Sequence, residues 1–407
     1  AARTAGRQSL VAAATRRRRA RGPGQVSAPL DGLVVADFSR VLAGPLATTA
    51  LADLGAQVIK VERRGVGDDT RRWGPPWTET SSSYFESANR SKQSLELDLA
   101  DPDDRDVAYD LVRRADVLVE NFRVGALDRH GLGYGDVRTL NPRLVYCSIS
   151  GFGSGEGASL PGYDFVVQAL GGLMSITGDA DGEPSKVGVA LVDVLTGKDA
   201  VIAILAALAE RERSDEGQHV EVNLLSSLLG SLANQASAYL TTGVAPRRIG
   251  NRHPSIAPYE TLHCRDGMLA VACGNDGQFA RLAKALGIAE LAEDERFATN
   301  PARVAHREEM VAALEGVLRD DDASHWQRVL LDADVPVGEV ADIGAALERA
   351  RELGLDPTVD VGPGHPPQVR HSATYSRSTV ATPSPPPTLG QHNDEVRRFL
   401  AAETTRP

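Results

Sequence analysis

The alternation of apolar and polar blocks at the start of the chain predicts a parallel sheet. An apolar run at 33–38 is followed by Gly44-Pro45 and a helical stripe that ends near Gly55. A second apolar run follows at 57–62. Pro45 suits the first position of a helix, and a strand, a helix and a strand in close succession form a βαβ unit whose strands run parallel.

The same alternation continues over the next part of the chain. Asp101 and Pro102 have the side chains expected at the N-cap and the first position of a helix. Further strands are expected at 116–120, 144–149 and 219–222, and further helices at about 164–175 and 196–213. We therefore predict an α/β fold.

Beyond residue 224 the pattern changes. A rather apolar helix is expected over 224–240, and a smaller α/β domain over about 256–345, with a strand at 269–273 and a helix at 278–286. A proline-rich stretch at 383–387 precedes a final helix at 393–401. The chain thus predicts a large domain, a smaller one and a C-terminal tail.

Composition narrows the class of protein. The chain has 407 residues and a formal net charge of −11, which argues against a nucleic-acid binder. Its three cysteines form no C-x-x-C, and His219 and His253 have no H-x-x-x-H partner, so neither a disulfide framework nor a metal site is expected. A reducing compartment, the cytoplasm, is the default expectation. The Arg-rich segment 1–27 suggests either disorder or a transit peptide, which would place the protein in the mitochondrial matrix.

Glycines of a G-x-G-x-x-G turn are missing after the first strand, so NAD binding is not expected.

Basic residues and aspartates are the two kinds of side chain that are candidates for binding or catalysis. Basic residues gather where strands end, which suits either a phosphate-bearing ligand or a solvated surface. They are Arg40, Arg63, Arg64, Arg71, Arg72, Arg90, Lys92, Arg123 and Arg129. Asp193 ends an apolar run before a helix, where it suits either a nucleophilic carboxylate or a simple N-cap, and Asp164 has the same ambiguity.

Several longer stretches resemble the family III CoA-transferases of the CaiB/BaiF type, which include formyl-CoA transferase and the related α-methylacyl-CoA racemases. The resemblance spans about 28–400 and is carried by 30–45, 52–62, 67–71, 87–92, 116–122, 131–134, 161–164 and 389–392. It implies a large Rossmann-like domain, a smaller domain and an interlocked homodimer. The expected division is a large domain at 28–223, a small domain at 224–345, and a tail at 346–407 that returns to the large domain.

The resemblance also implies a site. The family nucleophile, an aspartate, aligns with Asp193, and coenzyme A is expected as part of the substrate rather than as a resident cofactor. Residues that match the CoA-lining positions of the family are Val41, Arg63, Leu97, Asn121, Phe122 and Arg129. Two family lysines near the phosphates align with Ala100 and Pro161, and Arg64 or Arg71 are candidates to compensate.

One position separates the two activities of the family. The histidine that acts as a base in the racemases aligns with Tyr163, and a tyrosine is a poor base at neutral pH, which favours a transferase. The stretches 68–76, 87–92 and 253–259 most resemble succinyl-CoA:dicarboxylate transferases acting on glutarate or hydroxymethylglutarate. Arg40 or Arg90 would then pair with a distal carboxylate. A racemase and a CoA-binding protein without turnover remain alternatives, and neither a nucleic-acid nor a membrane partner is expected.

Overall fold

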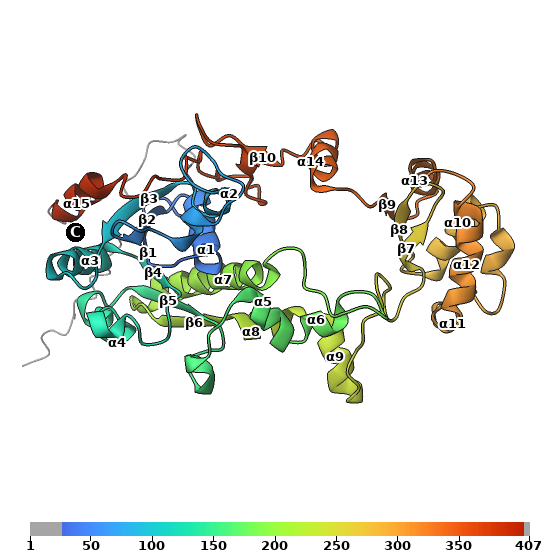
Figure 1. The fold of residues 1–407 in the computed structure, drawn as a ribbon, viewed down its shortest axis with the longest axis horizontal. Coiled ribbons are helices and arrows are strands. Elements are labelled where there is room, and N and C mark those ends of the chain that lie inside the picture. The colour runs from blue at the N-terminus through green and yellow to red at the C-terminus, as the bar shows by residue number, and fades with distance from the viewer. Residues whose placement is uncertain (1–26, 403–407) are drawn as a thin grey trace, which may run out of the picture.

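The computed structural model describes residues 27–402, and its largest element is a six-stranded parallel sheet in the order β3-β2-β1-β4-β5-β6. The strands are β1 (Val34–Asp37), β2 (Gln57–Arg63), β3 (Lys92–Leu97), β4 (Val117–Glu120), β5 (Val145–Ser150) and β6 (His219–Asn223). The order reverses between β1 and β4, so the loops after these two strands diverge and leave a crevice at the carboxyl edge. Figure 1 shows this sheet in one of two bodies of the molecule.

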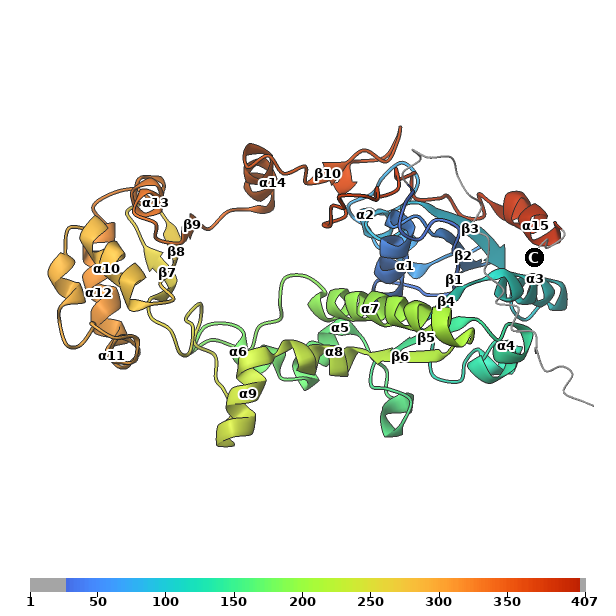
Figure 2. The ribbon, with the colours of Figure 1, turned by 180° about the vertical axis from the view of Figure 1, so that it is seen from behind.

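Helices cover both faces of the sheet. The helices of this part of the chain are α1 (Ala43–Asp53), α2 (Ser83–Glu86), α3 (Pro102–Arg114), α4 (Tyr134–Leu140), α5 (Asp164–Leu170), α6 (Leu173–Ile176), α7 (Leu191–Ser214), α8 (Leu224–Ser231) and α9 (Ala233–Thr242). On one face α1, α7 and α8 enclose a core that includes Leu51, Val119 and Ile204. On the other face α3, α4 and α15 (Asn393–Ala401) enclose a second core around Leu111 and Val396. Figure 2 shows α7 lying along β5 and β6.

A second body has its own apolar core. Its antiparallel strands are β7 (Tyr259–His263), β8 (Met268–Ala272) and β9 (Val337–Glu339). Its helices are α10 (Asp276–Ala285), α11 (Asn300–Ala305), α12 (Arg307–Leu318) and α13 (Ala323–Asp332). Phe279, Leu314 and Leu330 are among the buried residues of this core. Two chain segments join the bodies, one after α9 and one through α14 (Ile343–Glu352) (Figure 1).

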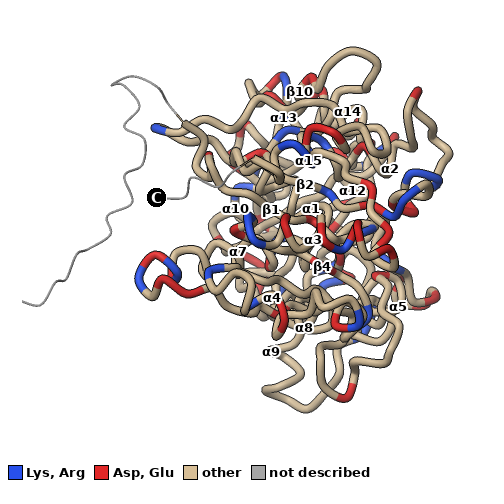
Figure 3. The backbone as a smooth tube through the Cα atoms, turned by 90° about the vertical axis from the view of Figure 1, so that its left-hand side faces the viewer, with Lys and Arg blue, Asp and Glu red and all other residues tan. Residues whose placement is uncertain are grey.

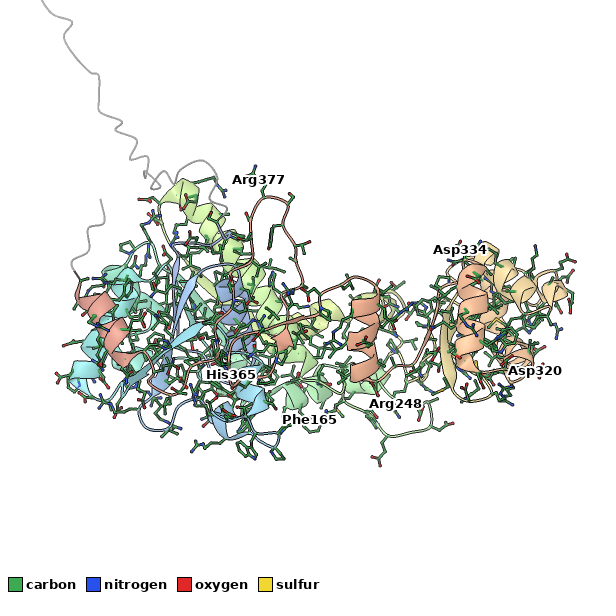
Figure 4. All side chains as sticks on the ribbon, turned by 90° about the horizontal axis from the view of Figure 1, so that it is seen from above. Phe165, Arg248, Asp320, Asp334, His365 and Arg377 are labelled. Atoms are coloured by element: carbon green, nitrogen blue, oxygen red, sulfur yellow. The ribbon has the colours of Figure 1, made fainter. Side chains whose placement is uncertain are left out.

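The C-terminal part of the chain returns to the parallel sheet. It forms the short pair β10 (Thr358–Val359) and β11 (Gln368–Val369), and α15 then packs beside α3 and β3. His365 contacts the buried Glu86 of α2 through Nδ1 at 2.8 Å, and Figure 4 shows it within the body that holds the sheet. The expected division of the chain into domains and a tail stays a prediction.

Most predicted elements are confirmed, with three corrections. Asp101 caps α3, Pro102 stands at its start, and the final helix spans Asn393–Ala401. The helices predicted at 164–175 and 224–240 are each broken in two, at Gly172 (φ +86°) and near Ala233 (φ +43°), because these residues adopt left-handed backbone. The helix predicted from 196 begins at Leu191, and β3 was not predicted at all.

The N-terminal segment and the expectation of no membrane or nucleic-acid partner concern the surface and ends of the chain. The segment 1–27, for which disorder or a transit peptide was expected, lies outside the described residues except for its last position. Within residues 27–402 no helix has the length and apolar character needed to cross a membrane. Figure 3 shows basic and acidic positions interspersed over this end of the molecule rather than gathered into one basic face.

Candidate active site

A pocket with a volume of about 220 Å³ opens at the carboxyl ends of β1, β4 and β5. Arg40–Leu42 follow β1, Asn121 and Phe122 follow β4, and 149–153 end β5; all of these segments line the pocket. Pro161–Tyr163 and Asp193 also line the pocket. The parallel strands therefore bring segments far apart in sequence to one crevice, as expected for this class of sheet.

Asp193 enters the pocket from the first turn of α7. The N-cap of this helix is Ala190, so Asp193 lies inside the helix and the simple N-cap interpretation does not hold. Gly197, one turn later, lets α7 approach α1 closely, since a Cβ there would lie 2.8 Å from the carbonyl oxygen of Ala43. The pKa of Asp193 is raised to about 7, first by burial and second by the negative charge of Asp164.

Asp164 is the first residue of α5, and its carboxylate turns to the N-terminus of α7. It accepts hydrogen bonds from the backbone N–H of Val192 at 2.7 Å and of Asp193 at 3.3 Å. Gln168 donates a further bond to it at 2.7 Å. These bonds satisfy N–H groups that a helix leaves unpaired at its start. Asp164 therefore fixes the turn that carries Asp193 and also repels its negative charge.

The loop after β1 is tied to the loop after β4. The Asn121 side chain accepts the N–H of Arg40 at 2.8 Å and donates to its carbonyl at 2.7 Å. The Arg40 guanidinium lies 5.0 Å above the ring of Phe122 and 3.5 Å from Asp69. Of the expected CoA-lining residues, the structure thus brings Val41, Asn121 and Phe122 together at the pocket.

The other expected residues lie elsewhere. Leu97 is 2 % exposed and packs in the core beneath α3, while Arg63 and Arg129 are exposed and do not line this pocket. Arg63 has Asp69 3.7 Å away, and Arg129 donates to the carbonyl of Ala126. These three side chains therefore do not join the group that surrounds Asp193.

Arg90 is buried and already paired. Its guanidinium makes two bonds to the Asp53 carboxylate, at 2.9 and 2.6 Å. A third, at 3.3 Å, runs to Gln368 of the returning tail. Arg90 also does not line the pocket, so its guanidinium does not face a substrate there.

The two arginines considered as replacements for the family lysines are also engaged. Arg64 bonds to Asp101 and Asp104, and Arg71 bonds to Glu62 at 2.9 and 2.7 Å. Arg123, by contrast, lines the pocket. Pro161 lines it as well, so an apolar side chain stands in the pocket where the family resemblance places a lysine.

Two tyrosines stand near the carboxylates. Tyr163, the N-cap of α5, is 63 % exposed and lines the pocket. Tyr84 of α2 was missed by the sequence reasoning: its pKa is raised to about 12, first by burial and then by the negative charges of Asp193 and Asp164. Trp73 packs edge-on against it at 5.3 Å. Tyr84 lies between the stretches 67–71 and 87–92 that carry the family resemblance, and no sequence motif marked it.

The fold and the pocket define a class of protein: a doubly wound α/β enzyme with a half-buried carboxylate at the switch point of its sheet. The sequence model of CoA-transferase family III matches residues 30–393. The chain belongs to this family and is a CoA-transferase, an enzyme whose substrates are CoA thioesters.

Named relatives agree with this assignment. The chain is 44 % identical to a succinate–glutarate CoA-transferase of Agrobacterium fabrum, covering 90 % of this chain and 94 % of that protein. It is 42 % identical to an acetyl-CoA:oxalate CoA-transferase of Acetobacter aceti, covering 85 % and 90 %. It is 40 % identical to a succinyl-CoA:glutarate CoA-transferase of Mus musculus, covering 90 % and 85 %. A crystal structure of a CaiB/BaiF family protein from Brucella suis superposes with a TM-score of 0.83 at 44 % identity, covering 92 % of this chain and all of that one.

Proposed function

We propose that this CoA-transferase moves CoA from succinyl-CoA to a dicarboxylate, with Asp193 as the nucleophile. The observation that carries the proposal is the Asp193 carboxylate, which lines the pocket and is held by the first turn of α7. A carboxylate with a pKa of about 7 is partly ionised at neutral pH, so it is available to attack. The relatives that transfer CoA between succinate and glutarate support the choice of acids.

The proposed reaction has two halves. Asp193 attacks the thioester carbonyl of the donor, the C–S bond breaks, and an aspartyl–acyl anhydride and CoA thiolate result. The thiolate then attacks the aspartyl carbonyl, which releases the donor acid and leaves an aspartyl-CoA thioester. The acceptor carboxylate attacks that thioester, the C–S bond breaks, and a second aspartyl–acyl anhydride and CoA thiolate result. The thiolate then attacks the acceptor's acyl carbonyl, which gives the new acyl-CoA and frees the Asp193 carboxylate. Each covalent step preserves an activated acyl group, provided that water is kept out.

The pocket side chains suit the two ends of such a substrate. We assign Val41, Asn121 and Phe122 to the CoA portion, because they line the pocket together. Arg123 is the pocket cation that we assign to the CoA phosphates in place of the family lysines. Arg40 supplies a guanidinium for the distal carboxylate of a dicarboxylate, through charge-assisted hydrogen bonds.

We also propose that the protein works as the interlocked homodimer that the family resemblance implies. Large apolar side chains stand exposed on α5, α7, α9 and α14, at Phe165 (57 %), Ile202 (65 %), Leu240 (81 %) and Ile343 (83 %). Figure 4 shows Phe165 on the lower edge of its body. An interlocked partner subunit that covered these side chains would remove their apolar surface from water.

The test offers a panel of mono- and dicarboxylic acids to the enzyme with succinyl-CoA and identifies the acyl-CoA products by mass spectrometry. We expect dicarboxyl-CoA products, glutaryl-CoA among them. Trapping with hydroxylamine during turnover should label the peptide that contains Asp193. Asp193→Asn should still bind CoA but lose transfer, whereas Asp199→Asn, an exposed change on the same helix, should not. A label on the peptide containing Asp164, or transfer by Asp193→Asn within about tenfold of wild type, would refute the mechanism.

A further inference from the structure

The segment between β1 and α1 forms one wall of the pocket and holds a strained residue. Val41 has a φ of +68°, in the left-handed region that β-branched side chains rarely adopt. Arg40, Val41 and Leu42 all line the pocket. A backbone conformation that its own residue disfavours persists only where surrounding groups enforce it. The shape of this wall therefore depends on side chains outside it.

Neighbouring side chains hold the polar backbone groups that precede Val41. Asp37 accepts the N–H of Ser39 at 3.0 Å, and Lys60 donates to the carbonyl of Ser39 at 2.9 Å. Asn121 bonds both the N–H and the carbonyl of Arg40. Each backbone group of these two residues is thus paired with a side chain from β1, β2 or the end of β4. The loop is fixed by tertiary contacts rather than by a regular turn.

Asp68 is the side chain that holds the strained residue itself. Its two carboxylate oxygens lie 3.3 and 3.2 Å from the backbone nitrogen of Val41, which donates to them. Oδ2 also lies 3.0 Å from Nζ of Lys60, and Thr70 donates its N–H at 3.0 Å and its hydroxyl at 2.8 Å to Oδ1. Asp68 and Lys60 are almost fully buried, at 1 % and 0 % exposed. Asp68 cannot turn away without leaving a buried lysine charge unpaired.

We infer that Asp68 is a positioning residue for this enzyme: it holds Val41 in left-handed backbone and so preforms the wall on which the CoA portion binds. The inference rests on the proposed function, which assigns Val41 to CoA contact. Binding to a preformed wall avoids the cost of ordering it. Asp68 therefore acts on CoA affinity and KM, while bond formation at Asp193 is left largely unchanged.

The first test compares wild type with Asp68→Asn. The amide has one acceptor oxygen and no charge for Lys60, so the bond to Val41 weakens. Titration calorimetry with CoA should show binding at least about tenfold weaker, with a matching rise in KM for succinyl-CoA and kcat within about threefold. Asp116→Asn is the matched control, because Asp116 also accepts a backbone N–H, from Val34, and pairs with the buried Arg211. It lies at the amino edge of the sheet and should leave CoA affinity unchanged.

A double-mutant cycle separates positioning from general stability. Glycine adopts a φ of +68° without steric cost, so Val41→Gly removes the strain that Asp68 opposes. In the Val41→Gly background, Asp68→Asn should weaken CoA binding by no more than about threefold. A merely structural role for Asp68 would give the same penalty in both backgrounds, which would overturn the inference.

Titration of wild type and Asp68→Asn with CoA also separates the inference about Asp68 from the proposed function. If wild type binds CoA and Asp68→Asn binds it with equal affinity, the inference is overturned and the proposed function stands. Wild type that does not bind CoA would overturn the proposed function, and the inference with it. Should Asp68→Asn not fold, Thr70→Val loosens the same carboxylate without removing its charge. It should weaken CoA binding about threefold, and an unchanged affinity would overturn the inference.

Discussion

Replacing Asp193 by asparagine should make the protein more stable at pH 8. The pKa of Asp193 is raised from 3.8 to about 7, mainly by burial and then by the charge of Asp164. Its ionised form is therefore disfavoured in the folded protein. A group of this kind contributes stability below its unfolded pKa and loses that contribution as the pH rises through its folded pKa. Asparagine keeps the shape and carries no charge, so it avoids the loss.

The magnitude follows from the shift. A change from 3.8 to about 7 is roughly 3 pKa units, or about 4 kcal/mol at 1.36 kcal/mol per unit, fully expressed above pH 7. Because Asp193 is only partly buried, solvent screening lowers this figure, and we expect about 1–4 kcal/mol. In a chain of this length that corresponds to a rise in Tm of roughly 1–5 °C. Near pH 4 the expected gain is close to zero.

The assay is thermal unfolding of wild type and Asp193→Asn at a series of pH values from 4 to 8, without ligand. The difference in Tm should grow with pH and level off above pH 7. Asp199→Asn, also on α7 but exposed, is the control and should show no such growth. An asparagine variant less stable than wild type at pH 8, or a difference that does not depend on pH, would refute the reasoning.

Three further predictions concern activity. The kcat of wild type should rise with pH through about 7 as Asp193 ionises. In Asp164→Asn the midpoint of this rise should lie about 1 pKa unit lower, because one negative charge near Asp193 is gone. Profiles of kcat against pH for the two proteins would check both statements. Arg40→Ala should lower kcat/KM for dicarboxylates at least about tenfold more than for monocarboxylates, and equal losses would remove the specificity role. Tyr163 should not act as a base, so 2-methylacyl-CoA incubated with enzyme in deuterated water should gain no α-deuterium above background; enzyme-dependent exchange would instead favour a racemase.

Local pattern was sufficient for much of the fold. Apolar runs located β1, β2, β4, β5 and β6 to within a few residues, and Asp101-Pro102 marked the start of α3. The strand β3, at the edge of the sheet, was not predicted because its first three residues, Lys92–Ser94, are all polar, so no apolar run marks it. Its place is decided by its pairing with β2, which no local pattern contains.

The start of α7, which carries Asp193, is also decided by a tertiary contact that no local pattern contains. The sequence placed Asp193 before a helix, whereas the helix begins at Leu191 because Asp164 supplies its cap from another helix. The hydrogen bonds from the N–H groups of Val192 and Asp193 to Asp164 hold Asp193 in the first turn of α7. The charge of Asp164 is also the second of the two causes that raise the pKa of Asp193.

The sequence by itself determined the parallel α/β class, the family resemblance and the candidacy of Asp193, because these rest on hydrophobic periodicity and on motifs that are contiguous in the chain. Only the tertiary structure decided which charged side chains face the pocket. Arg90, a candidate for substrate binding, pairs instead with Asp53, and Lys60 and Asp68 lie buried beneath the pocket wall. Charge pairing joins residues distant in sequence and leaves no periodic trace, so the partner of each arginine and lysine is fixed only when the strands come together.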